Sequence, residues 1–270
     1  MILSRKQRVV TSLTAPAYLW LTLTIFLPLS AMLYFSFLTV APIGGREASF
    51  TLAHYRAFFT KEIYWYNAWR SFELAFYVTT LCVLLAYPAA YALTHYIKGR
   101  WREALFLAVV LPFWSNALVR TFSWTMVLRG EVDLLFTYPA IVIGLVHAYL
   151  PYAILTIYVS LEAIEQSLTE AARSLGASPL AAFLRVTLPL SLPGVLAGAI
   201  LIFVPVTGSF MEPRILGGKN AIMLGPIIEN QFTAVFNWPL GAALSFIMLA
   251  IMLLMLAAGA PFLARYLRQG

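Results

Sequence analysis

Six long apolar runs limit what this chain can fold into more than any other feature of its sequence. Each run approaches or exceeds the roughly 20 residues that an α-helix needs to cross about 30 Å of hydrocarbon. Unpaired backbone groups are too costly in lipid, so each run is predicted to form a helix. Prolines inside several runs predict kinks. The predicted spans are 15–38, 72–96, 104–128, 138–159, 190–206 and 240–262.

The composition supports a membrane protein. Of 270 residues, 61% are hydrophobic and only 11% are charged, whereas a soluble domain carries about a quarter charged residues. A single globular core cannot bury this apolar excess, so membrane lipid is an expected partner. The sequence contains no convincing internal repeat, low-complexity tract or soluble domain. We therefore predict an all-α membrane protein in which residues 1–270 form a single transmembrane domain.

The basic residues give the chain a net charge of +7 and a pI of about 9.6. They cluster at the ends of the apolar runs, which is typical of topology signals, and no nucleic-acid partner is predicted. With six spans, the N-terminal tail, the loop IKGRWRE and the C-terminal tail lie on one side, which the positive-inside rule makes the cytoplasm. The loop 39–71 on the opposite side also carries four basic residues, but long loops weigh less. Both termini are therefore predicted to be cytoplasmic.

Residues 161–189 form a polar interruption between two apolar runs, on the predicted cytoplasmic side. Apolar residues at steps of three and four in its first part favour a short amphipathic helix. Gly176 follows, where a left-handed residue commonly ends a helix. Ser178-Pro179 is typical of the cap and first turn of a second helix. The segment thus predicts two short helices joined by a glycine, a compact shape suited to a mechanical contact.

The stretch EAARSLGASPLAAFLRVTLP resembles the signature of the membrane subunits of binding-protein-dependent ABC importers. That signature is Glu-Ala-Ala, three residues, Gly, nine residues and Ile-x-Leu-Pro. Val186 stands in place of Ile, which is a conservative departure. The order of six spans, with this segment between the fourth and fifth, is also similar to that family. The residues that match at the required spacing are Glu170, Ala171, Ala172, Gly176, Leu188 and Pro189.

The resemblance implies a type I importer permease that forms half of a translocation pathway and is not itself an enzyme. The chain has no GxxxxGK[ST] loop, and GGKN at 217–220 lacks its spacing and hydroxyl. No cofactor is therefore expected on this chain, and ATP and Mg²⁺ are expected in a partner ATPase. The resemblance implies that the helix carrying Glu170 docks in a groove of that ATPase, in the bacterial cytoplasmic membrane. The implied partners are a second related permease, two copies of the cytoplasmic ATPase, and a periplasmic or extracellular substrate-binding protein.

Three further stretches resemble the permeases of spermidine/putrescine importers, and the first of the two paired permeases more than the second. This resemblance implies a polyamine substrate. Another small amine, an amino-acid derivative, an iron ligand or an anion stays open, because the binding protein fixes most of the selectivity in this family. The stretches are LPFWSNALVRTFSW (111–124), VPVTGSFMEPRILGGKN (204–220) and NWPLGAALSF (237–246).

Charged and aromatic residues inside a span are candidates for the substrate pathway. Trp114 and Asn116 in the third run are both candidates, but they point about 200° apart on a helix and cannot both face one narrow pore. Trp114 can hold an ammonium group by a cation–π contact or can simply pack. Arg120 would repel a polyamine. It is predicted to form a structural ion pair with Glu73 or Glu212, or to cap carbonyl groups.

Glu73 and Glu212 are also the acidic candidates for a cation route, because they are near membrane depth, whereas Glu131 and Asp133 lie in a loop. Each can instead be a surface charge or an ion-pair partner. Residues 208–232 are too interrupted to span and are predicted at the outer face. There they either dock the binding protein or form a packed loop, with a turn at Gly217-Gly218.

The remaining polar residues predict no other chemistry. His54, His95 and His147 are scattered, so no metal site is predicted. An intramembrane enzyme would need clustered catalytic residues at one depth, and none are found. A self-sufficient channel or secondary transporter would not need the Glu-Ala-Ala segment and usually shows internal repeats.

Overall fold

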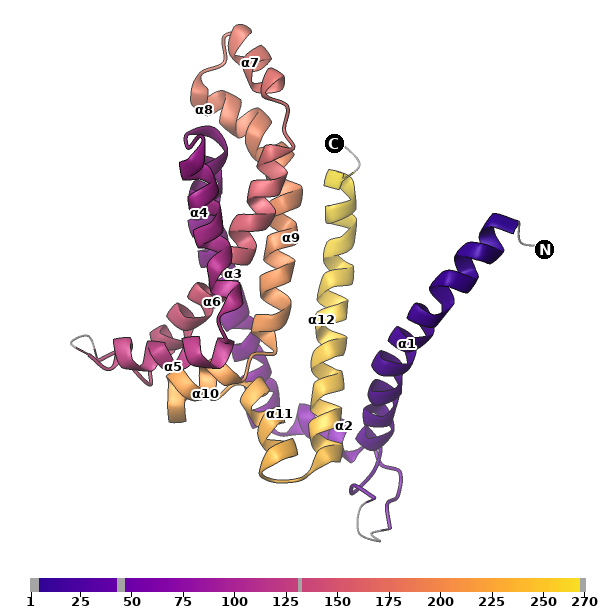
Figure 1. Cartoon of the computed structure of the whole chain (residues 1–270). Helices are drawn as coiled ribbons and strands as arrows, with labels where there is room; N and C mark the ends of the chain where they lie inside the picture. The colour runs from indigo at the N-terminus through magenta and orange to yellow at the C-terminus, as the bar shows by residue number, and fades with distance from the viewer. Residues whose placement is uncertain (1–4, 43–46, 131–132, 268–270) are drawn as a thin grey trace. The chain divides into compact units, whose positions relative to one another are not determined.

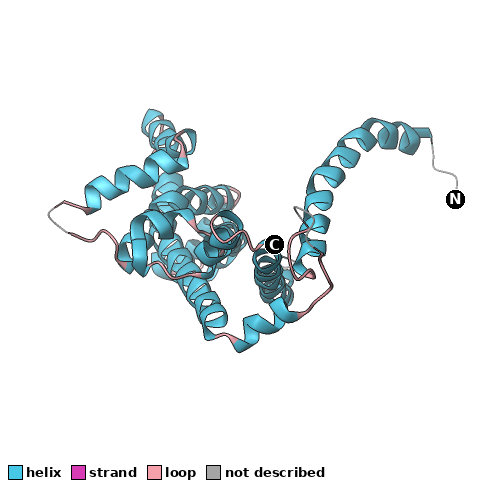
Figure 2. Ribbon diagram, turned by 90° about the horizontal axis from the view of Figure 1, so that it is seen from below, coloured by secondary structure: helices cyan, strands magenta, loops and turns pink. Residues whose placement is uncertain are grey.

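The structure is a computed structural model that describes residues 5–42, 47–130 and 133–267. In these residues it is helical and contains no strand (Figure 2); an isolated antiparallel bridge joins Leu38 to Phe50. The chain divides into two compact units. The first comprises residues 1–62 and 228–250, and the second residues 63–227 and 251–270.

The first unit contains α1 (Arg5–Ser36), α2 (Ala53–Thr60), the end of α11 (Leu224–Thr233) and the first part of α12 (Trp238–Leu267). Two hydrogen bonds hold α2 against the end of α1. The Ser36 and Tyr55 hydroxyls are 2.7 Å apart, and His54 Nε2 lies 2.9 Å from the Leu38 carbonyl oxygen. Along α1, large apolar side chains such as Leu27 are exposed, which requires lipid or another chain around this helix.

The second unit is built on three long helices, α3 (Glu62–His95), α6 (Tyr138–Glu162) and α9 (Leu188–Thr207), with α4 (Arg100–Val110) beside them (Figure 1). α5 (Ala117–Leu128) and α10 (Met211–Gly217) run across these helices (Figure 1). The shorter elements are η1 (Leu111–Trp114), α7 (Gln166–Ser174), α8 (Pro179–Ala182), η2 (Phe183–Thr187) and η3 (Gly218–Asn220).

Small residues allow α6 and α9 to pack closely. Gly194 and Gly198 of α9 form a Gly-x-x-x-Gly pair against α6. A Cβ atom on Gly194 would lie 2.6 Å from the Thr156 carbonyl oxygen, and one on Gly198 would lie 2.4 Å from Thr156 Oγ1. Helices in membranes associate through such small residues, because lipid provides no hydrophobic force between them.

α3 contributes a buried stripe of small side chains to the same core. Ala75, Val78, Cys82, Ala86 and Ala90 are fully buried at steps of three and four, which is the spacing of one helix face. The Cys82 thiol donates to the Val146 carbonyl oxygen of α6 at 3.7 Å. The single cysteine is therefore a packing residue between α3 and α6.

Five described helices are long and apolar enough to cross a membrane, or six if the bent pair formed by 100–114 and 117–128 counts as one span. The structure differs here from the continuous helix predicted over 104–128, because the chain bends by 100° between these two parts. Pro112 lies in the turn before the bend, and the Asn116 side chain caps a new helix by accepting from the Leu118 N–H at 2.8 Å. The five helices are Leu13–Ser36, Glu62–His95, Tyr138–Glu162, Pro179–Thr207 and Trp238–Gly259.

Candidate functional site

The helix that carries the Glu-Ala-Ala sequence stands free of the core. α7 has no buried residue, and it lies with α8 at one end of the second unit, where α6 ends and α9 begins (Figure 1). Leu168 is 46% exposed and Leu175 is 90% exposed. Glu170 and Ala171 are also exposed, and Ala172 is half-buried. An amphipathic helix with exposed leucines on a polar segment is a surface that a partner can cover.

The joint after α7 confirms the prediction for Gly176. This residue has a left-handed φ of +88°. The Ala177 N–H donates to the Ala172 carbonyl oxygen at 3.1 Å, and the Gly176 N–H donates to the Arg173 carbonyl oxygen at 3.0 Å. These two bonds form a Schellman motif, which satisfies carbonyl groups at the end of the helix. The backbone angle, and not lack of space, requires glycine here, since a Cβ atom would meet nothing within 4 Å.

The second helix begins at Ser178-Pro179 as predicted and continues past Leu188-Pro189. The Ser178 side chain accepts from the Ala181 N–H at 3.2 Å and so caps α8. From Pro179 the helix then continues through η2 into α9 without a break. Leu188 and Pro189 therefore lie inside a continuous helix that joins the segment after Gly176 directly to the fifth span. This continuity gives α8 a stiff connection to the membrane.

A groove of about 580 Å³ lies between the end of α3, the end of α6, and the segment formed by α7, α8 and η2. Its lining is mixed in charge: it includes the basic residues Lys98 and Arg173 and the acidic residues Glu162 and Glu170. The groove therefore brings Glu170 into the same space as the C-terminal end of α3.

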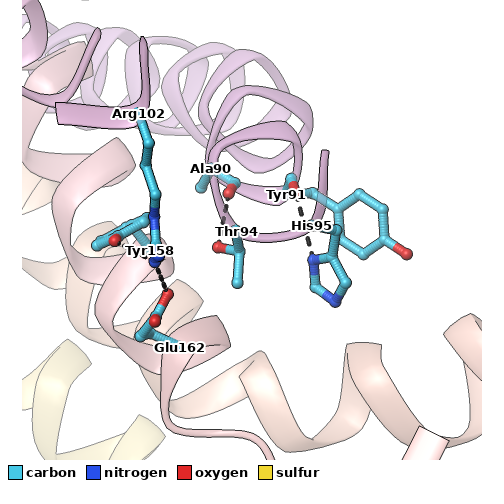
Figure 3. A network of polar contacts seen from close by, with 7 residues as sticks. All are labelled: Ala90, Tyr91, Thr94, His95, Arg102, Tyr158 and Glu162. Carbon is cyan, nitrogen blue, oxygen red and sulfur yellow. Dashed lines mark hydrogen bonds and ion pairs between the residues drawn. The ribbon is translucent and has the colours of Figure 1, made fainter. Parts of the chain in front are cut away.

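An ion pair braces the end of α6 beside this groove. Arg102 of α4 donates to the Glu162 carboxylate and, at 2.6 Å, to the Tyr158 hydroxyl (Figure 3). The Arg102 guanidinium also lies 5.4 Å from the Tyr158 ring centroid. In Figure 3, Tyr91 and His95 lie together on the neighbouring turn of α3, where their rings stack with centroids 4.2 Å apart. The first set of contacts joins α4 to α6, and the stacked rings lie within α3.

The pathway candidates of the third run lie on both sides of the bend. Trp114 is 87% exposed at the end of η1, and Asn116 is used as the helix cap. Arg120 donates to the Pro112 carbonyl oxygen at 2.8 Å and to Ser115 Oγ at 3.4 Å. Of the residues that the structure describes, neither Glu73 nor Glu212 pairs with Arg120. The predicted ion pair of Arg120 is therefore wrong. Its guanidinium instead caps a carbonyl group across the bend, which was the alternative prediction.

A pocket of about 400 Å³ opens beside Arg120, on a face that the sequence prediction did not single out. Trp124 and His147 also line it, with their rings 5.4 Å apart at 70°. The signal for this face was present, because the α5 residues that line the pocket recur at steps of three and four. The lining residues are Pro112, Ser115, Val119, Arg120, Ser123, Trp124, Val127 and His147.

The acidic candidates differ in their surroundings. Glu73 is exposed on α3, whereas Glu212 on α10 is only 8% exposed. Ser209 Oγ donates to the Glu212 carboxylate at 2.6 Å. Glu131 lies outside the described residues. Glu212 lies on α10, outside the candidate spans. Burial makes a charged carboxylate costly, so Glu212 stays a candidate for a functional role.

The segment 208–232, which was predicted at the outer face, forms the short helices α10 and α11, with η3 between them. The turn predicted at Gly217-Gly218 is confirmed by the left-handed φ of +53° at Gly218. In the part of the chain that the structure describes, no group of three or more His, Cys, Asp or Glu residues lies close enough together to hold a metal ion.

Comparison with known proteins agrees with this arrangement. The family model described as the inner membrane component of binding-protein-dependent transport systems matches residues 83–270. The chain belongs to this family. It is therefore a permease of the type I ABC importer kind and a multi-pass inner-membrane protein. The predicted fold class, an all-α membrane protein with the fold of these importer permeases, is confirmed.

Two sequence relatives and one solved structure are similar to this permease. It is 33% identical over 253 residues to the spermidine/putrescine transport system permease protein PotB of Escherichia coli (strain K12), covering 88% of this chain and 91% of that protein. It is 32% identical to PotB of Haemophilus influenzae, covering 88% of each chain. Among solved structures, a bacterial ABC transporter that imports the acidic polysaccharide alginate matches with a TM-score of 0.70 at 19% identity, covering 98% of this chain and 99% of that chain. The solved structure supports the fold alone.

Proposed function

We propose that this permease forms half of the translocation pathway of an ATP-driven importer and is coupled through α7 to a separate cytoplasmic ATPase. The observation that carries the proposal is the free-standing α7, which has no buried residue and ends in a rigid Schellman motif. Glu170, Ala171 and Ala172 offer a charge and a close approach to the partner, while Gly176 sets the exit angle. Leu188 and Pro189 lie on the helix that carries the displacement into the membrane.

The proposed assembly contains this permease, a second related permease, two copies of the ATPase and a substrate-binding protein on the outer side. The family description, which names dependence on a binding protein, supports the last of these. ATP and Mg²⁺ bind to the ATPase in this proposal, and this chain holds no cofactor. Both termini are cytoplasmic, which places α7 on the side where ATP is available.

The proposed substrate is a polyamine, because the relative at 33% identity is a spermidine/putrescine transport system permease. Glu212 is the best candidate for contact with a cationic substrate, since it is buried beside Ser209 and away from any cation partner among the described ion pairs. Glu73 is a weaker candidate because it is exposed. Trp114 is exposed enough to meet a substrate, whereas Asn116 is occupied as a cap.

The test is uptake in proteoliposomes that contain the complete complex. We expect ATP-dependent accumulation of labelled spermidine or putrescine when the binding protein is present, and none when the ATPase is omitted. Accumulation without the ATPase would instead indicate a channel or a secondary transporter. A thermal-shift screen of the binding protein with polyamines, amino-acid derivatives, iron ligands and anions identifies the substrate if polyamines are not accumulated.

A further inference from the structure

One turn of π-helix lies inside the continuous helix that leads from α8 into α9. At its end the Leu188 N–H donates to the Phe183 carbonyl oxygen, five residues earlier. An α-helix would use the residue four positions earlier, so this turn, 183–187, contains one extra residue. Such turns are uncommon and are found mostly at functional positions.

The sequence gives a physical reason for the wide turn. Pro189 has no N–H to donate, and in a regular α-helix its ring would clash with the carbonyl group of Arg185. Widening the preceding turn moves that carbonyl group away from the ring. The Leu188-Pro189 pair and the π-turn are therefore parts of one local arrangement.

The π-turn rests against α3 through an aromatic seat formed by Tyr87 and Tyr91, which are one turn apart. Both rings meet Phe183 edge-on, with centroids 5.8 Å and 5.5 Å from it and interplanar angles of 86° and 87°. Edge-to-face contacts of this kind fix the direction of a ring as well as its distance. Below the seat, the Tyr87 hydroxyl lies 2.8 Å from Ser191 Oγ of α9.

The residues on either side of Phe183 are also fixed. Ala182 and Thr187 are each only 2% exposed, whereas Leu184 and Arg185 between them are exposed. The π-turn therefore has one face held against the core and one face free to rearrange. Upstream of it, α7 has no buried residue.

We propose that the π-turn 183–187 and its aromatic seat position the α7–α8 segment for coupling, with Phe183, Tyr87 and Tyr91 as the positioning residues. A force on α7 reaches the turn through the stiff α8, and the seat passes it to α3 and α9 together. Return of the turn to α-helical geometry would rotate α8 by about 100° relative to α9, the angle of one residue. This inference rests on the proposed contact of α7 with an ATPase.

The test compares variants in the complete complex, with binding-protein-stimulated ATP hydrolysis and uptake measured on the same preparation. Phe183→Leu and Tyr91→Leu keep apolar volume but remove the edge-on contacts. Deletion of Arg185 removes the extra residue. We expect each variant to raise the number of ATP molecules hydrolysed per molecule transported by roughly five- to tenfold. This is the lower part of the range that typical coupling free energies between two sites produce. Tyr91→Phe, which keeps the ring, should restore the wild-type ratio, and Leu184→Ala on the free face should not change it.

The outcomes separate this inference from the proposed function. If Glu170→Ala uncouples hydrolysis from uptake while Phe183→Leu and Tyr91→Leu keep the wild-type ratio, the seat has no positioning role and the proposed function stands. If Glu170→Ala also has no effect, the contact through α7 itself is wrong. The amount of ATPase that co-purifies with each variant shows whether the complex has assembled. If the Arg185 deletion variant does not assemble, the ratios measured for Phe183→Leu and Tyr91→Leu decide whether the aromatic seat has a positioning role.

Discussion

At Gly176 a single backbone angle determines how the helix with the Glu-Ala-Ala sequence ends. The left-handed region costs other L-residues roughly 1–2 kcal/mol. Gly176→Ala should therefore fray the end of α7 without any clash, since the space beside it is open. We expect normal membrane insertion but several-fold lower uptake.

Gly208 provides the matched control for this change. Its φ of −89° is accessible to any residue, and a Cβ atom there would make only an ordinary contact, at 3.9 Å from the Pro205 carbonyl oxygen. Gly208→Ala should retain wild-type uptake. Equal uptake by the two alanine variants would show that the angle at Gly176 does not matter for transport.

Glu212 gives the second prediction for single residues. Glu212→Gln keeps the size and the hydrogen bond from Ser209 but removes the negative charge. If the carboxylate meets a cationic substrate, uptake should fall several-fold while hydrolysis without substrate stays at the wild-type rate. Glu73→Gln, at an exposed position, should have the smaller effect. A larger loss of uptake in Glu73→Gln than in Glu212→Gln would show that Glu212 is not part of the substrate route.

Local rules predicted some of these residues and not others. The joint at Gly176 and the cap at Ser178 follow from sequence neighbours alone, so they could be predicted. The partner of Arg120 could not, because the Pro112 carbonyl group comes within reach only where the chain bends. The burial of Glu212 likewise depends on α10 packing against distant helices.

At the scale of elements, the close approach of α6 and α9 carries a prediction for stability. Gly194→Ala would place a Cβ atom 2.6 Å from the backbone oxygen of Thr156, and backbone cannot move aside as a side chain can. Overpacking of this kind costs about 1–3 kcal/mol. The thermal midpoint of the purified complex should fall. Gly259→Ala is the control in another membrane helix, since a Cβ atom there meets nothing within 4 Å. An unchanged midpoint for Gly194→Ala would contradict the packing.

The helices were predictable where the sequence contains one long apolar run or one continuous apolar face. The structure extends the second predicted span, 72–96, back to Glu62, because YWYNAW continues the helix of α3. The bend in 104–128 was not predicted, although Pro112 and the cap residue Asn116 both mark it. An apolar run identifies residues that suit a membrane, and it does not say whether they form one helix or two.

At the scale of the whole molecule, some exposed leucines lie in membrane spans and others lie outside them. Leu27 of α1 is 61% exposed and Leu175 after α7 is 90% exposed, but only the first lies in a span. A lysine near the centre of a membrane helix costs roughly 2.5–3.5 kcal/mol. Leu27→Lys should therefore lower the amount of protein inserted in the membrane, whereas Leu175→Lys should insert normally. Equal insertion of both variants would contradict the assigned span.

The class of protein was the most predictable property, because the apolar runs and the six-residue signature can both be recognised in the sequence without knowledge of the fold. What surrounds α1 and α5 could not be predicted, since it depends on other chains. The alginate importer shares the fold at 19% identity, so this likeness supports the fold alone.

A cross-link from α7 to the ATPase tests the central claim most directly. Cys82 is fully buried, so Ala171→Cys introduces one accessible thiol on the proposed docking surface. With a maleimide–benzophenone reagent, the maleimide adds to this thiol and the light-activated benzophenone inserts into a C–H bond of whatever lies beside it. The account predicts an adduct between this chain and the ATPase that changes in yield when ATP is added. Met126→Cys, on the exposed face of α5, should give no ATPase adduct. No adduct from Ala171→Cys in an active complex, or equal adducts from both positions, would contradict the claim that α7 is where this permease meets its ATPase.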